Sequence, residues 1–96
     1  MGRMGSSHEQ RTARFFGRVQ GVGFRYAACR AAGGFAVTGH VRNLSDGSVE
    51  CVVEGEPGEI DAFLAELADR MAGSIDRTTR QSSPATGRFD GFSVRY

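Results

Sequence analysis

Lysine is absent from this chain of 96 residues, so all twelve of its basic residues are arginines. No lysine is present to form a Schiff base, or to hold a phosphate at the end of a Gly-Lys-Ser/Thr loop. The arginines are nearly balanced by 11 acidic residues, which leaves a formal net charge of +1. A charge so close to zero gives no global electrostatic reason to expect nucleic acid or an anionic membrane as a partner.

Cysteine is scarce, and long apolar runs are missing altogether. Cys29 and Cys51 are too few for a disulfide scaffold and lack the spacing of a metal site. We therefore expect two reduced, semi-buried thiols in a cytoplasmic protein. No apolar run is long enough to span a membrane. Residues 1–10 are polar and rich in glycine and serine, so we expect a disordered arm rather than a signal peptide.

The spacing of the apolar residues predicts two helices among five strands. Helices are expected from Phe24 to the Gly33-Gly34 pair, and from Pro57 to Gly73. Strands are expected over residues 11–19, 35–43, 48–54, 75–83 and 91–96, and the polar composition of 75–83 suits an edge. This order is typical of an α+β, ferredoxin-like split β-α-β fold, with an antiparallel sheet of four to five strands and two helices on one face. We place this single domain at residues 11–96.

The loop that joins the first strand to the first helix has the composition of an anion site. Glycines 21 and 23 let its backbone curl, and the first turn of a helix leaves amide N–H groups without partners. Such a loop can surround a phosphate, and the planar fork of Arg25 can hold two of its oxygens. A Walker A loop is excluded because Gly23 is followed by Phe24-Arg25, and the dinucleotide fingerprint is excluded because Tyr26 replaces its third glycine.

A second cluster of polar residues lies at the hairpin between the second and third strands. Asn43 is expected at the end of the second strand, and Asp46-Gly47 is a strong hairpin signal. A short carboxamide beside a phosphate site can hold a water in line with the phosphorus. The alternative role for Asn43 is that of a turn residue that caps the hairpin.

These two segments resemble the signatures of the acylphosphatase family. Residues 17–25 match Gly-x-Val-Gln-Gly-Val-x-Phe-Arg at every fixed position, and residues 39–50 match Gly-x-Val-x-Asn, a glycine turn and Val-Glu. The resemblance implies a monomeric, metal-free hydrolase of small acyl phosphates without a cofactor. It assigns phosphate binding to Arg25 and orientation of the attacking water to Asn43. The backbone amides of five residues would complete the phosphate site: Gln20, Gly21, Val22, Gly23 and Phe24.

Two other functions remain open at this stage. On the first strand, Arg14, Phe16 and Arg18 alternate with the apolar residues and are therefore expected on the opposite face of the sheet. That face could stack the bases of RNA. Alternatively, the chain could resemble the acylphosphatase-like module of carbamoyl-transfer maturation factors and act on carbamoyl phosphate. A site that holds only the phosphate leaves the acyl group unspecified, so broad selectivity is expected.

Two further groups of residues are predicted to have no role in the site. His40 has the opposite parity to Val41 and Asn43, so we expect a histidine on the surface or on a sheet face. The glutamates 54, 56 and 59 are expected to be a solvated run of charge.

Overall fold

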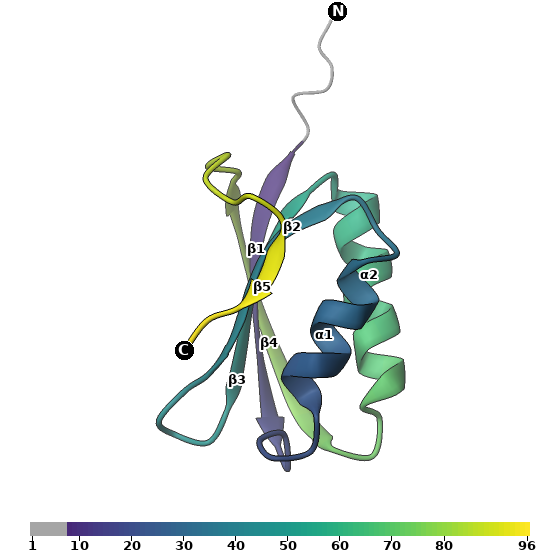
Figure 1. Ribbon diagram of the computed structural model, residues 1–96, viewed down its shortest axis with the longest axis vertical. Coiled ribbons are helices and arrows are strands. Elements are labelled where there is room, and N and C mark those ends of the chain that lie inside the picture. Colours follow the sequence, from purple (N-terminus) through teal and green to yellow (C-terminus); the bar gives the residue numbers. More distant parts are fainter. Residues whose placement is uncertain (1–7) are drawn as a thin grey trace, which may run out of the picture.

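The computed structural model describes residues 8–96, which form five strands and two helices (Figure 1). The elements are, in chain order, β1 (Glu9–Gly17), α1 (Phe24–Ala32), β2 (Val37–Asn43), β3 (Val49–Gly55), α2 (Pro57–Arg70), β4 (Ile75–Pro84) and β5 (Phe92–Val94). Every predicted element is present, with its ends displaced by three residues or fewer, close to the usual uncertainty of such boundaries. Most of the predicted arm, residues 1–7, lies outside the described residues.

The five strands form one sheet in the order β4-β1-β3-β2-β5, and both helices cover the same face (Figure 1). The ferredoxin-like prediction is therefore confirmed, with polar β4 at an edge as expected. The sheet is not wholly antiparallel, because β5 pairs with β2 in parallel. β4 ends at the end of the sheet where β2 begins, so the chain enters β5 beside the start of β2 and runs in the same direction.

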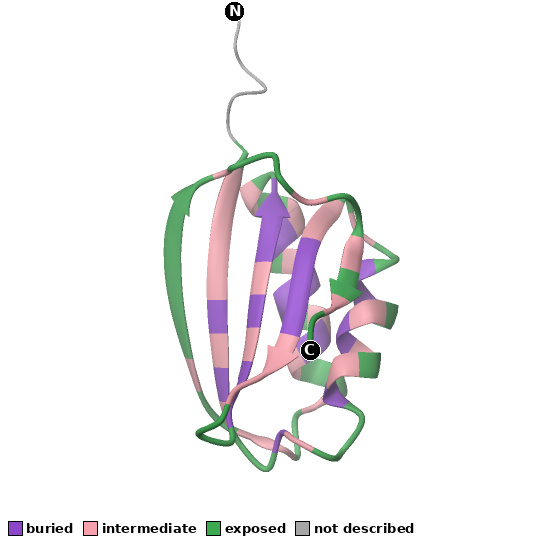
Figure 2. Cartoon of the chain, turned by 60° about the vertical axis from the view of Figure 1, so that its left-hand side comes forward, coloured by how far each residue is buried: buried purple, intermediate pink, exposed green. Residues whose placement is uncertain are grey.

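The hydrophobic core lies between the sheet and the two helices. Figure 2 shows the buried residues on the central strands and on the inner sides of the helices, whereas β4 is mostly exposed. The buried apolar residues alternate along the strands and recur every three or four residues on the helices: Ala13, Phe15 and Val19; Val49, Cys51 and Val53; Phe24, Ala28 and Ala31; and Ile60, Phe63, Leu64 and Leu67. Neither helix of the described residues has the length and apolar content needed to cross a membrane.

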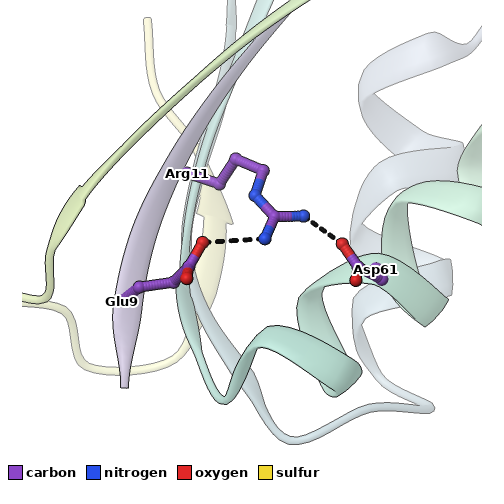
Figure 3. A network of polar contacts seen from close by, with 3 residues as sticks. All are labelled: Glu9, Arg11 and Asp61. Carbon is purple, nitrogen blue, oxygen red and sulfur yellow. Dashed lines mark hydrogen bonds and ion pairs between the residues drawn. The ribbon is translucent and has the colours of Figure 1, made fainter. Parts of the chain in front are cut away.

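The first strand begins at Glu9, two residues earlier than predicted, because its first residues have partners on both sides. Glu9 pairs with Gly55 of β3 and with Pro84 of β4. The guanidinium of Arg11 joins this end of the sheet to the helix layer. It donates a hydrogen bond to the Glu9 carboxylate at 2.7 Å and another to the Asp61 carboxylate of α2 (Figure 3).

The prediction of a solvated glutamate run is wrong for Glu54, which is buried, whereas Glu56 is exposed and Glu59 is half-buried. Glu54 is only 4% exposed, and its carboxylate accepts hydrogen bonds from Gln10 and from the backbone amides of Thr86 and Gly87. Burial alone would raise the pKa of Glu54, but these hydrogen bonds outweigh it and lower the pKa. Glu59 accepts a hydrogen bond from the Ala36 amide at 2.8 Å. Both carboxylates hold loops in place, which their clustering in the sequence did not indicate.

His40 lies on the sheet face away from the helices, as its parity predicted. It is 8% exposed, because the segment between β4 and β5 covers it and brings the Phe89 ring to 5.5 Å from its own ring. Burial and the neighbouring Arg95 lower the pKa of His40, which disfavours its charged form.

The sheet allows no side chain at Gly39, the first fixed residue of the second motif. Gly39 has a φ of +144°, and a Cβ there would lie 1.9 Å from the Val52 carbonyl oxygen of β3. The strands β2 and β3 would have to separate to accommodate it. We predict that Gly39→Ala lowers the free energy of unfolding, measured by urea denaturation, by at least about 2 kcal/mol.

Gly58→Ala provides the matched control in the same measurement. Gly58 lies in the first turn of α2, and a Cβ there would meet nothing within 4 Å. This substitution is expected to stabilise the protein by about 0.5–1 kcal/mol, because alanine favours the helix. Equal stabilities for the two variants would contradict the assignment of Gly39 to a backbone contact.

Candidate phosphate site at the ends of β1 and β2

Two buried side chains anchor the glycine loop, residues 18–23. Val19 is fully buried, and Phe24 is 2% exposed with its ring centroid 5.0 Å from that of Phe15. Between these two anchors, residues 21–23 are exposed. The loop therefore has fixed ends and an open centre, and α1 begins where the second anchor enters the core.

The backbone of the glycine loop is open to a ligand from Gln20 onward, whereas the Arg18 amide donates to the Ser74 carbonyl. Gly21 and Gly23 have φ angles of +76° and +81°, in the left-handed region that L side chains disfavour. Among the described residues, no hydrogen bond uses a backbone amide of residues 20–24 as its donor. The first backbone amide of this region with an internal partner is that of Ala27, which donates to the Gly23 carbonyl. A curled run of unpaired amides at a helix start is a site for an anion.

The side chain of Gln20 joins the glycine loop to the β2–β3 hairpin. Its Nε2 donates to the carbonyl oxygens of Leu44 at 2.8 Å and Ser48 at 2.9 Å. The hairpin itself is closed by hydrogen bonds from the Leu44 amide to the Ser48 carbonyl and from the Gly47 amide to the Leu44 carbonyl. One side chain therefore fixes the loop against the turn that follows Asn43.

The turn is held in shape by a carboxylate that lies within it. The Asp46 carboxylate accepts hydrogen bonds from the amide and the hydroxyl of Ser48, at 2.9 Å and 2.5 Å. These two hydrogen bonds lower the pKa of Asp46, so it is ionised at neutral pH. The Asp-Gly hairpin signal is confirmed, and its aspartate supports the turn at the end of β2.

Arg25 and Asn43 line the same cavity, whose volume is about 370 Å³. Three of the residues predicted to contribute amides also line it, namely Gly21, Gly23 and Phe24. Gln20 and Val22 do not line it. The Gln20 side chain is directed to the hairpin instead. The cavity thus combines a guanidinium, a carboxamide and the open part of the glycine loop, a set of groups that can bind a phosphate dianion and a water.

The structure adds residues to the cavity that the motifs did not indicate. Tyr26, Cys29 and Val94 line it, and so does Tyr96, whose ring centroid lies 5.3 Å from the Arg25 Cζ. Cys29 follows Arg25 by four residues, so its place on the same helix face could have been read from the sequence. Val94 and Tyr96 come from the far end of the chain, and only the tertiary structure shows that they reach the site.

Neither cysteine has the surroundings of a nucleophile. Burial raises the pKa of Cys29, so its thiol is neutral beside the cavity. Burial also raises the pKa of Cys51, which is fully buried rather than semi-buried as predicted. Both are free thiols, and the described part of the chain has no group of three or more His, Cys, Asp or Glu that could hold a metal ion.

Comparison with known proteins gives a consistent result. A model of the family described as Acylphosphatase matches residues 11–94. An acylphosphatase of Paenarthrobacter aurescens is 45% identical over 84 residues, which are 86% of this chain and 89% of that protein. The crystal structure of acylphosphatase from Bacillus subtilis superposes with a TM-score of 0.82 at 30% identity, and covers 92% of this chain and 99% of that one. HypF of T. kodakarensis gives a TM-score of 0.78 at 32% identity, over 92% of this chain but only 12% of HypF.

The link between loop and hairpin can be tested at Gln20. Gln20→Met keeps the length of the side chain and removes the donor, and we predict a loss of about 1–2 kcal/mol in the free energy of unfolding. Hydrogen exchange of the Leu44 amide should accelerate as well. Gln81→Met, on the exposed edge strand β4, is the matched control and should change stability by less than about 0.5 kcal/mol. Equal effects at the two positions would show that the Gln20 contact does not hold the hairpin.

Proposed function

The chain belongs to the acylphosphatase family, and we propose that it hydrolyses acyl phosphates at the cavity between α1 and the end of β2. The observation that carries this proposal is that Arg25 and Asn43 line one cavity together with the unpaired backbone of the glycine loop. The products are a carboxylate and inorganic phosphate.

The substrate itself explains why so few groups suffice. The leaving group of an acyl phosphate is a carboxylate, whose conjugate acid has a pKa of roughly 4, as for Asp and Glu. It leaves at neutral pH without a proton, so the site needs no general acid. What remains for the protein is to neutralise the phosphoryl oxygens and to place a water in line.

Arg25 and the amides of the glycine loop perform the first of these tasks. The guanidinium can donate two parallel hydrogen bonds to phosphoryl oxygens, and the amides of Gly21 and Gly23 can donate to the same group. These donors are fixed before the substrate arrives, since Val19 and Phe24 anchor the loop in the core. Preorganised donors stabilise developing charge without a cost of reorientation during the reaction.

Asn43 performs the second task by orienting the attacking water. The Asn43 carboxamide oxygen accepts a hydrogen bond from a water placed opposite the acyl oxygen. The water oxygen then forms a bond to phosphorus as the bond from phosphorus to the acyl oxygen breaks, and the electron pair leaves on the carboxylate. A carboxamide is not a base, so the water proton passes to a phosphoryl oxygen or to solvent. Positioning of this kind can contribute about 7–11 kcal/mol in favourable cases.

The remaining expectations follow from the composition of the site. Arg25, Asn43 and the glycine loop supply every group that the proposed reaction needs, so we expect a monomer that uses no cofactor, and we propose no role for nucleic acid or a membrane. The reduced state of Cys29 and Cys51 supports a cytoplasmic location. Carbamoyl phosphate has the same carbonyl–phosphate bond and remains the second candidate substrate, favoured by the similarity to part of HypF.

Substitutions at the two side chains should have different kinetic effects. Arg25→Ala removes the guanidinium, and we predict that kcat/KM for benzoyl phosphate falls at least about 100-fold while inhibition by inorganic phosphate weakens strongly. Asn43→Ala removes only the group that orients water, so kcat should fall about 100-fold while the inhibition constant for phosphate changes less than about threefold.

Arg42→Ala is the matched control for charge. Arg42 precedes Asn43 on β2 and pairs with Glu50 at 2.8 Å on the opposite face of the sheet. Its removal deletes the same charge near the site and should leave kcat/KM within about twofold. An Asn43→Ala variant with the rate of the unmodified enzyme would contradict the role in water positioning.

The reaction should also proceed without a divalent metal ion. With excess chelator present, the rate of benzoyl phosphate hydrolysis is expected to stay within about twofold of its initial value, because Arg25 and the loop amides supply the positive charge that a metal would otherwise provide. Magnesium ions added in excess of the chelator serve as the control. A rate lost with chelator and restored by magnesium would refute this mechanism.

A further inference from the structure

The large hydrophobic side chains that remain exposed gather around the phosphate site. Among residues 8–96 these are Val22, Tyr26 and Tyr96, which are 40%, 69% and 99% exposed. Both tyrosines line the cavity, and Val22 lies in the glycine loop. Scattered exposed apolar residues are normal on a protein surface and need no explanation. Their concentration at one ligand cavity indicates a surface that is covered when the ligand is bound.

The cavity extends beyond the groups that would hold the phosphate. Its volume of about 370 Å³ falls within the range of about 300–1,000 Å³ that is typical of small-molecule sites. The part of its wall that Arg25, Asn43 and the glycine loop do not form is largely apolar, and it consists of Phe24, Tyr26, Cys29, Val94 and Tyr96. The phosphoryl group alone would leave this wall in contact with water.

Each of the two tyrosines lies near an arginine. The Arg25 Cζ lies 5.3 Å from the Tyr96 ring centroid, and the Arg30 Cζ lies 6.0 Å from that of Tyr26. A cation–π contact does not use up the five N–H donors of a guanidinium, so those of Arg25 that do not face the ring remain available for phosphoryl oxygens. Tyr96 can therefore stay on Arg25 while a substrate is bound.

We propose that Tyr26 and Tyr96 form an acyl-binding wall that selects acyl phosphates with large apolar or aromatic acyl groups over small or polar ones. This inference rests on the proposed hydrolysis at Arg25 and Asn43, and it replaces the broad selectivity expected from the sequence. Tyr26 comes from α1 and Tyr96 follows β5, which pairs with β2 in parallel, so the two rings reach the cavity from different elements.

The basis of the selectivity is the apolar area that the acyl group covers. A benzoyl or long aliphatic acyl group can bury the faces of both rings, and the free energy of that burial grows with the area removed from water. An acetyl group covers little of the wall, and the amide of a carbamoyl group would lose hydrogen bonds to water against it. The wall thus disfavours carbamoyl phosphate, the second candidate substrate.

The test compares kcat/KM for benzoyl, acetyl and carbamoyl phosphate in the unmodified enzyme and in Tyr26→Ala, Tyr96→Ala and the double variant. For each substrate, the kcat/KM of the variant is divided by the kcat/KM of the unmodified enzyme. Differences in intrinsic reactivity between the substrates cancel in this ratio. We expect the double variant to lose about tenfold more kcat/KM for benzoyl phosphate than for acetyl phosphate. The high exposure of both rings means that these substitutions remove little packing.

Two control variants separate the acyl-binding wall from other effects. Tyr26→Phe and Tyr96→Phe retain the apolar face and should retain the preference for benzoyl phosphate. Phe16→Ala removes an aromatic ring on the opposite face of the sheet, where it contacts the Arg77 guanidinium at 4.1 Å, and should leave the substrate ratios unchanged.

Each alternative outcome is distinguishable. If the tyrosine variants lose activity on all three substrates equally, Tyr96 acts only through Arg25 and the acyl-binding wall is overturned, while the proposed hydrolysis stands. A preference of the unmodified enzyme for carbamoyl phosphate would overturn it in the same way. If the unmodified enzyme hydrolyses none of the three, both the proposed function and this inference fail.

Discussion

Two hydrogen bonds from the Gln20 side chain connect segments that are far apart in the sequence. The strands β1 and β2 are not neighbours, because β3 lies between them, yet the register aligns Phe15, Val49 and Asn43 in one row across the three strands. The chain beyond β1 must then reach over β3 to bring Arg25 near Asn43. Gln20 completes this path by bonding to both ends of the β2–β3 turn. This contact joins the two segments of the chain that carry Arg25 and Asn43.

The same arrangement separates the groups that fold the chain from those proposed to bind ligand. Val19 and Phe24 are buried and fix the ends of the glycine loop, whereas the amides between them have no partners among residues 8–96. A donor left unsatisfied in this way carries a cost in stability, and it persists because solvent reaches the loop and a ligand can satisfy it. The backbone amides of the glycine loop from Gln20 onward are therefore left unpaired within a fold whose strands and helices are otherwise well hydrogen-bonded.

Much of this structure could be predicted because its signals are local. The alternation around Ala13 and Phe15, the stripe of α2 and the Asp46-Gly47 turn each depend on neighbours within a few residues. The parallel pairing of β5, the burial of Glu54 and the place of Tyr96 beside Arg25 depend on contacts between distant segments. Composition and periodicity do not report contacts between distant segments. For this reason the sequence did not predict these three features.

The central claim is that the glycine loop, Arg25 and Asn43 form one site that holds a phosphoryl group while a water attacks it. A crystal structure with vanadate, which can adopt the five-coordinate geometry of the transition state, tests this claim most directly. The account predicts equatorial oxygens within hydrogen-bonding distance of the Arg25 guanidinium and the amides of residues 21–24, and an apical oxygen bonded to the Asn43 carboxamide. Vanadate bound away from Arg25, or with both apical oxygens out of reach of Asn43, would contradict it.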